Sequence, residues 1–120
     1  NRNQLVEVDL ASGRERIMFE SGKNIDLPAS VTLEVPVYSD RRQALAVTLR
    51  GGRRGTAVID ARGRARMVGG GCQINWAPDG SYLFYVDHGG RLKNAFYRVD
   101  PDTLRKSLWF DDPGPWSHEY

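Results

Sequence analysis

The chain has 120 residues, a formal net charge of +2 and a single cysteine. This length allows one modest hydrophobic core, and one cysteine excludes an internal disulfide. No apolar run approaches the roughly 18 residues of a membrane span, and the start lacks the layout of a signal peptide. Nearly all the positive charge is arginine, fourteen residues against three lysines. Any functional meaning of this charge therefore depends on where the arginines fall.

One pattern occurs three times: an apolar run that ends on aspartate, a short turn, and a second run of basic and apolar residues. Each copy predicts two β-strands joined by a tight turn. We expect the repeated aspartate to accept backbone hydrogen bonds in that turn, which is ordinary chemistry for aspartate there. The copies are Leu5–Asp9 with Arg16–Phe19, Thr56–Asp60 with Arg66–Val68, and Phe96–Asp100 with Ser107–Phe110.

The first two copies are spaced more widely than the last two. Asp9 and Asp60 are 51 residues apart, whereas Asp60 and Asp100 are 40 apart. The additional residues fall in Glu20–Ser30, which we interpret as an insertion. Insertions on one face of a repeat array often form its binding surface. The alternative is a surface loop that the fold tolerates.

Four short strands are predicted in the middle of the chain. Glu34–Tyr38 alternates apolar with other residues, and Ala44–Leu49 is an apolar run suited to a strand covered on both faces. Gly51–Gly55 breaks this run with three glycines. Thr56–Asp60 and Arg64–Val68 then complete a unit of four antiparallel strands.

The following residues repeat the same order. Strands are expected at Gln73–Trp76, Tyr82–Val86, Ala95–Asp100 and Arg105–Phe110, and Pro78–Gly80 forms a turn in which glycine supplies the positive φ. Trp76 overlays the equivalent position of the preceding unit at an offset of 38 residues. A unit of about 40 residues with four short strands is what a propeller blade requires.

The sequence therefore predicts an all-β fold of β-propeller blades, each a four-stranded antiparallel sheet, as a partial propeller or a segment of a longer one. We expect one domain in four parts: 1–19, the last two strands of a blade; 31–68, a second blade; 72–110, a third; and 111–120, a crossing to a further blade. Open blade faces invite association. Either the chain continues in a longer protein or two copies form a homodimer.

The stretch Trp76–Phe84 resembles the repeat signature of TolB-like β-propellers, in which an aromatic and a small residue precede Pro-Asp-Gly and an apolar strand. The preceding unit departs from it, with Asp40-Arg41-Arg42 in place of Pro-Asp-Gly. Such repeats occur in periplasmic scaffold proteins, in propellers that gate prolyl-oligopeptidase-type hydrolases, and in secreted proteins. The resemblance implies a periplasmic or secreted location and carries over no catalytic residue.

Antiparallel strand order places the longer connections on one face and the tight turns on the other. The longer connections carry basic residues that could attract an acidic partner protein or an anionic ligand; the alternative is ordinary solvated loops. Aromatic residues do not interleave with them, so nucleic acid is not expected. The candidate binding residues are Arg50, Arg53, Arg54, Lys23, His88, Arg91 and Lys93.

No catalytic, phosphate-binding or metal-ligand motif occurs in the chain. We expect no enzyme activity, no cofactor and no metal site, and hence a non-catalytic propeller that serves as an interaction scaffold for a protein or an anionic ligand. The alternative is an accessory propeller of a larger enzyme, such as a prolyl-oligopeptidase-like hydrolase or a redox enzyme, whose catalytic domain lies outside this chain.

Overall fold

A computed structural model describes residues 3–87 and 95–110. This part of the chain contains ten β-strands and no helix, and therefore no helix that is long and apolar enough to cross a membrane. The strands are β1 (Gln4–Val8), β2 (Glu15–Glu20), β3 (Val31–Ser39), β4 (Ala44–Gly51), β5 (Gly55–Asp60), β6 (Ala65–Gly69), β7 (Cys72–Trp76), β8 (Leu83–Asp87), β9 (Ala95–Val99) and β10 (Lys106–Phe110).

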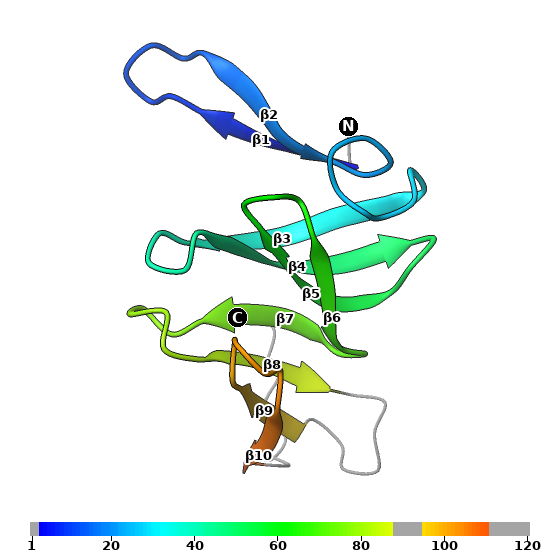
Figure 1. The fold of residues 1–120 in the computed structure, drawn as a ribbon, viewed down its shortest axis with the longest axis vertical. Coiled ribbons are helices and arrows are strands. Elements are labelled where there is room, and N and C mark those ends of the chain that lie inside the picture. Colours follow the sequence, from blue (N-terminus) through cyan, green and yellow to red (C-terminus); the bar gives the residue numbers. More distant parts are fainter. Residues whose placement is uncertain (1–2, 88–94, 111–120) are drawn as a thin grey trace, which may run out of the picture.

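The strands form three antiparallel sheets that lie one after another along the long axis of the molecule (Figure 1). The first sheet is the β1–β2 hairpin. The second contains β3 to β6 and the third β7 to β10, each with its strands side by side in chain order. The predicted all-β fold of four-stranded antiparallel sheets is confirmed. The division into blades at the expected boundaries stays a prediction.

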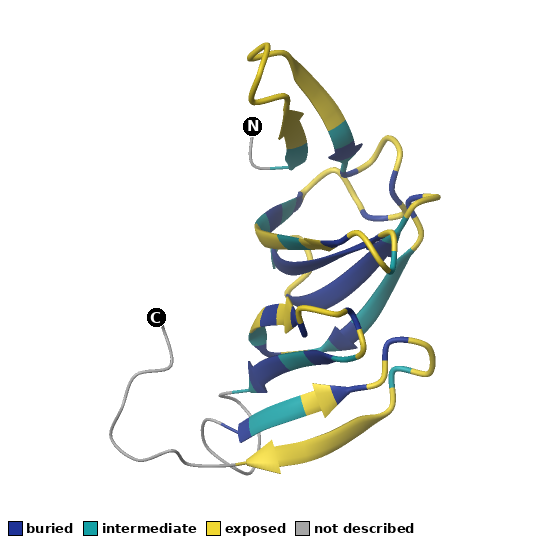
Figure 2. Ribbon diagram, turned by 90° about the vertical axis from the view of Figure 1, so that its left-hand side faces the viewer, coloured by how far each residue is buried: buried dark blue, intermediate teal, exposed yellow. Residues whose placement is uncertain are grey.

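Two hydrophobic clusters hold the sheets together, one on each face of the second sheet. Toward the first sheet, β4 contributes Leu45, Val47 and Leu49, which pack with Phe19 of β2. Toward the third sheet, the smaller Ala44, Ala46 and Val58 meet Trp76, Leu83 and Tyr85. All residues from 44 to 49 are buried, as expected for a strand covered on both faces (Figure 2).

The three aspartate turns use similar hydrogen bonds, in which one carboxylate oxygen accepts from the backbone N–H two residues further on and from a second one three or four residues further on. Asp9 Oδ1 accepts from the backbone N–H groups of Ala11 and Ser12, at 2.8 and 3.1 Å. Asp60 Oδ1 accepts from those of residues 62 and 64, and Asp100 Oδ1 from those of residues 102 and 103. The structural role predicted for these aspartates is confirmed. It also shows that the three hairpins are equivalent parts of one repeat.

The first strands of the two four-stranded sheets share a bulge. The pairing of β3 with β4 slips between Glu34 and Val37, and that of β7 with β8 slips between Cys72 and Asn75. Within these bulges Val35 and Gln73 have positive φ angles of 49° and 55°. The two residues are 38 positions apart, so the distortion repeats with the fold.

The stretch that we interpreted as an insertion is part of the core. Ile25 and Leu27 are only 6% and 4% exposed and pack in the cluster between the first two sheets. The stretch also bonds to the β5–β6 turn, because Asp26 Oδ1 accepts from the backbone N–H of Ala65 at 2.6 Å and the N–H of Asp26 donates to Gly63 O. The stretch is therefore more than a surface loop, because it contributes to the core and is held to the β5–β6 turn.

Candidate functional site

One arginine of the predicted basic surface, Arg50, already makes contacts within the protein. Arg50 lies in β4, where its Nη1 donates to the carbonyl of Leu49 at 3.2 Å and its Nε lies 3.7 Å from Glu34 Oε2. Both side chains are more than a third exposed, so this ion pair contributes little to stability. The neighbouring carboxylate of Glu34 nevertheless partly neutralises the positive charge of Arg50, which weakens its attraction for an anionic ligand.

Arg53 and Arg54 are the freer part of this surface. They lie in the exposed turn between β4 and β5, and within residues 3–87 and 95–110 neither guanidinium has an ion pair or a hydrogen bond. Lys23 belongs to the β2–β3 connection and pairs with Glu20 Oε2 at 3.3 Å. Two unpaired guanidinium groups therefore remain at this turn.

The turn and the β2–β3 connection lie on the same side of the molecule (Figure 1). They are joined directly, because the backbone N–H of Gly52 donates to Ser30 O at 3.2 Å. Gly51 is needed here, since its φ is +78° and a Cβ atom would lie 2.4 Å from Ser30 O. Three further candidates, His88, Arg91 and Lys93, lie outside the residues that the structure describes. The binding role of this surface thus stays a prediction.

Other arginines join the second sheet to the third. Arg42 Nε donates to Gly80 O at 2.7 Å, and its Nη1 lies 3.0 Å from Asp102 Oδ1. Arg66 donates from Nη2 to Pro101 O at 2.8 Å and from Nη1 to the carbonyl of Asp102 at 3.2 Å. Arg42 and Arg66 therefore stabilise the contact between the second and third sheets, and their guanidinium groups are engaged there. Their role depends on contacts 35 to 60 residues apart in sequence, which no local pattern indicates.

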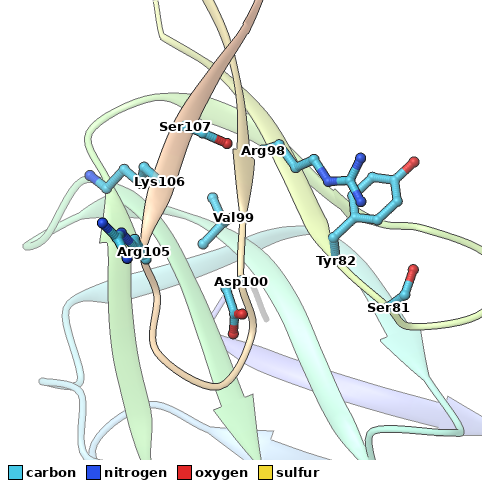
Figure 3. A pocket seen from close by; sticks show the side chains of 8 residues that line it. All are labelled: Ser81, Tyr82, Arg98, Val99, Asp100, Arg105, Lys106 and Ser107. Carbon is cyan, nitrogen blue, oxygen red and sulfur yellow. The ribbon is translucent and has the colours of Figure 1, made fainter.

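A hollow of about 270 Å³ lies at the third sheet, and three of its lining residues are cationic (Figure 3). Figure 3 shows Arg98 beside Tyr82 on one side of the strands and Arg105 with Lys106 on the other. The Arg98 guanidinium carbon lies 3.8 Å from the centre of the Tyr82 ring, a cation–π contact. The positive charges do not converge, so the hollow lacks the geometry of an anion-binding site.

The ionisable groups with a clear pKa shift have structural causes. Two backbone N–H donors, from Thr103 and Asp102, lower the pKa of Asp100. The hydroxyl and the backbone N–H of Ser81 lower the pKa of Asp79 in the same way. Burial raises the pKa of Tyr85 to about 12. None of these groups is prepared for proton transfer near neutral pH.

The stacked four-stranded antiparallel sheets define a β-propeller segment. No protein-family model and no curated protein sequence matches the chain, so its place among TolB-like proteins and its expected location stay predictions. Among solved structures, the fold matches an oligogalacturonate lyase in complex with manganese, with a TM-score of 0.65 and 24% sequence identity. The match covers 92% of this chain and 31% of the lyase chain. This chain therefore spans about a third of that enzyme's length.

The expectation that the chain is not an enzyme is wrong on this comparison, because the matching structure is itself an enzyme. The expectation rested on the absence of local catalytic motifs, but catalytic groups on a repeat fold can come from separate repeats and form no motif. The comparison gives no evidence for the interaction scaffold. At 24% identity it shows the fold alone.

The matching structure contains manganese, but the described residues of this chain form no metal site. Within residues 3–87 and 95–110, no group of three or more His, Cys, Asp or Glu side chains could hold a metal ion. Such donors are what a transition-metal site requires. No reaction step through a metal is therefore assigned to this part of the chain.

Proposed function

We propose that this chain is a segment of a β-propeller enzyme that acts on an acidic oligosaccharide, and that its own part is to bind the substrate. The observation that carries the proposal is the fold match to an oligogalacturonate lyase over 92% of this chain. The chain supplies a substrate-facing surface, and the rest of the enzyme supplies the catalytic groups.

The chemistry of the β4–β5 turn supports a polyanionic substrate. Each uronate unit carries one carboxylate, and a guanidinium can donate two parallel hydrogen bonds to it. Arg53 and Arg54 are exposed and unpaired within the described ranges, so binding a carboxylate breaks no ion pair. Lys23, which pairs with Glu20, adds positive charge from the β2–β3 connection. The resulting attraction weakens as salt rises.

The test is a lyase assay on the full-length polypeptide that contains this chain, with oligogalacturonate as substrate. Elimination from a uronate creates a conjugated double bond, which ultraviolet absorbance follows. We expect activity on the acidic oligosaccharide and none on a neutral galactose oligosaccharide of equal length. Absence of activity on both would reject the proposal.

The double substitution Arg53→Ala and Arg54→Ala tests the binding role of the turn. We expect KM for oligogalacturonate to rise about tenfold, corresponding to about 1.4 kcal/mol of lost binding, with kcat nearly unchanged. The matched control is Arg14→Ala, which removes an exposed arginine from the β1–β2 turn. Equal KM values for the double variant and the control would mean that these arginines do not bind substrate.

A further inference from the structure

The turn that carries the two unpaired arginines is short. β4 ends at Gly51 and β5 begins at Gly55, so that only Gly52, Arg53 and Arg54 lie between the two strands. Short hairpin loops have few favourable conformations. The direction in which the two guanidinium groups extend from the sheet therefore depends on how the two ends of the turn are held.

The first end of the turn is held by the β2–β3 connection. The backbone N–H of Gly52 donates to Ser30 O at 3.2 Å, which continues the β3–β4 ladder beyond its last pair, Val31 with Gly51. Gly51 lies so close to Ser30 that a Cβ atom at Gly51 would clash with the Ser30 carbonyl oxygen. The turn thus packs directly on the main chain of the connection, with no space for a side chain at this end.

The β2–β3 connection is itself fixed in place. Ile25 and Leu27 pack in the core between the first two sheets. The carbonyl of Leu27 accepts from the backbone N–H of Gly22 at 2.6 Å, and that of Pro28 accepts from Val31 at 3.0 Å. The carbonyl that holds the turn therefore belongs to a segment that the core and its own hydrogen bonds keep in one position.

The second end of the turn is held by β6. Thr56 is 0% exposed, and its Oγ1 donates to Gly69 O at 3.2 Å. A Cβ atom at Gly55 would clash with the same carbonyl oxygen. Gly55 is buried, whereas Arg53 and Arg54 are exposed. The two arginines thus lie between two ends that both contact the main chain of neighbouring segments.

We propose that the β4–β5 turn is pre-organised for binding: the β2–β3 connection and β6 hold Arg53 and Arg54 in their binding orientation before substrate arrives. Ser30 and Gly51 are positioning residues, which act through the turn. This inference rests on the proposed function, because it concerns the same two arginines. Ordering a flexible segment on binding costs affinity, and a turn that is fixed in advance avoids the backbone part of that cost.

The test is Gly51→Ala in the full-length polypeptide, because the added methyl group pushes the turn away from Ser30 O. The matched control is Gly13→Ala. Gly13 has a φ of +73°, close to the +78° of Gly51, but a Cβ atom at Gly13 would meet nothing within 4 Å. We expect Gly51→Ala to raise KM for oligogalacturonate about fivefold with kcat nearly unchanged, and Gly13→Ala to leave KM unchanged. Equal KM values for the two variants overturn the proposal.

The arginine double variant, Arg53→Ala with Arg54→Ala, separates positioning from general damage. Gly51→Ala added to this variant should raise KM no further, because no guanidinium group is left to misplace. A further rise overturns the positioning role. If the arginine variant alone raises KM and Gly51→Ala does not, only the positioning role is wrong. If the arginine variant leaves KM unchanged, the proposed function is wrong and the positioning role is overturned with it.

Hydrogen exchange of the unsubstituted polypeptide tests the same point if Gly51→Ala does not fold. The reference is the amide of Gly13, whose N–H donates to Asp9 O at 2.7 Å in a turn of the first sheet. We expect the Gly52 amide to exchange as slowly as that of Gly13, and added oligogalacturonate to leave its rate unchanged. Fast exchange without ligand, or slowing by more than about tenfold when ligand is added, would mean that the substrate orders the turn, which overturns the proposal.

Discussion

Val35 has an unusual conformation for its residue type. A β-branched side chain at φ +49° is strained, since the left-handed region places Cβ close to the backbone. Because Val35 is 57% exposed, its side chain contributes little burial in return. We expect Val35→Gly to raise the free energy of unfolding by about 1 kcal/mol, measured by urea denaturation.

The control for this change is Val37→Gly, two residues further along the same strand. It has no positive φ, so glycine there only loosens the strand and lowers stability. Destabilisation by both substitutions would show that the bulge is not strained at Val35.

Asp100 makes stability depend on pH in acid. Its pKa in the folded state is lowered by the backbone N–H groups of Thr103 and Asp102, so the ionised form stabilises the fold. That stability is fully present above the ordinary pKa of 3.8 and is lost as pH falls through the lowered folded-state pKa. We expect Asp100→Asn to make the fall in melting temperature below this pH shallower.

The comparison for the pH experiment is Glu15→Gln. This change removes an exposed carboxylate that makes no hydrogen bond or ion pair within residues 3–87 and 95–110, so the acid profile should keep its slope. An unchanged slope for Asp100→Asn as well would contradict the role of the turn aspartate.

At the scale of elements, Arg66 joins β6 to the β9–β10 turn. Its guanidinium donates to two carbonyls at 2.8 and 3.2 Å, and hydrogen bonds from a charged donor are stronger than neutral ones. We expect Arg66→Ala to lower the free energy of unfolding by about 1–2 kcal/mol, as measured by denaturant unfolding. Lysine lacks the planar fork, so Arg66→Lys should restore only part of this loss.

Arg64→Ala is the matched control, because Arg64 is exposed in the preceding turn and its hydrogen bonds with Asp60 come from its backbone. Its effect should stay within about 0.5 kcal/mol. Equal losses at residues 64 and 66 would mean that the contact between the sheets contributes nothing.

The β2–β3 connection shows where sequence analysis of elements fails. Its largely polar composition is typical of a loop, and the wider spacing of Asp9 and Asp60 correctly located the extra residues. The two apolar side chains within it, Ile25 and Leu27, reach a core made of residues from four other strands. Neither periodicity nor turn chemistry indicates such a contact, because it depends on how the first sheet lies on the second.

For the whole molecule, the last strand leaves an apolar end exposed. Every residue of β10 is exposed (Figure 2), and Leu108, Trp109 and Phe110 are 48%, 45% and 43% exposed. β10 also lies at the edge of its sheet. We expect this 120-residue chain to self-associate, so that its mean mass by light scattering rises with concentration above 13.5 kDa.

Trp109→Lys should lower this mean mass, since a charged residue on an edge strand opposes pairing. Thr103→Lys adds the same charge in the preceding turn and should leave the mass unchanged. A mass that stays at 13.5 kDa at all concentrations would show that the exposed end does not associate.

The amino-acid sequence alone determined the repeat, the strands and the aspartate turns, because alternation of apolar residues and turn chemistry act between near neighbours. It also located the basic candidates Arg53 and Arg54, which lie in a turn that three glycines mark. The tertiary structure was needed to show which arginines of residues 3–87 and 95–110 are free and which hold sheets together, and that Ile25 and Leu27 belong to the core. These properties depend on contacts between residues far apart in the chain, and the packing of one sheet on the next creates them.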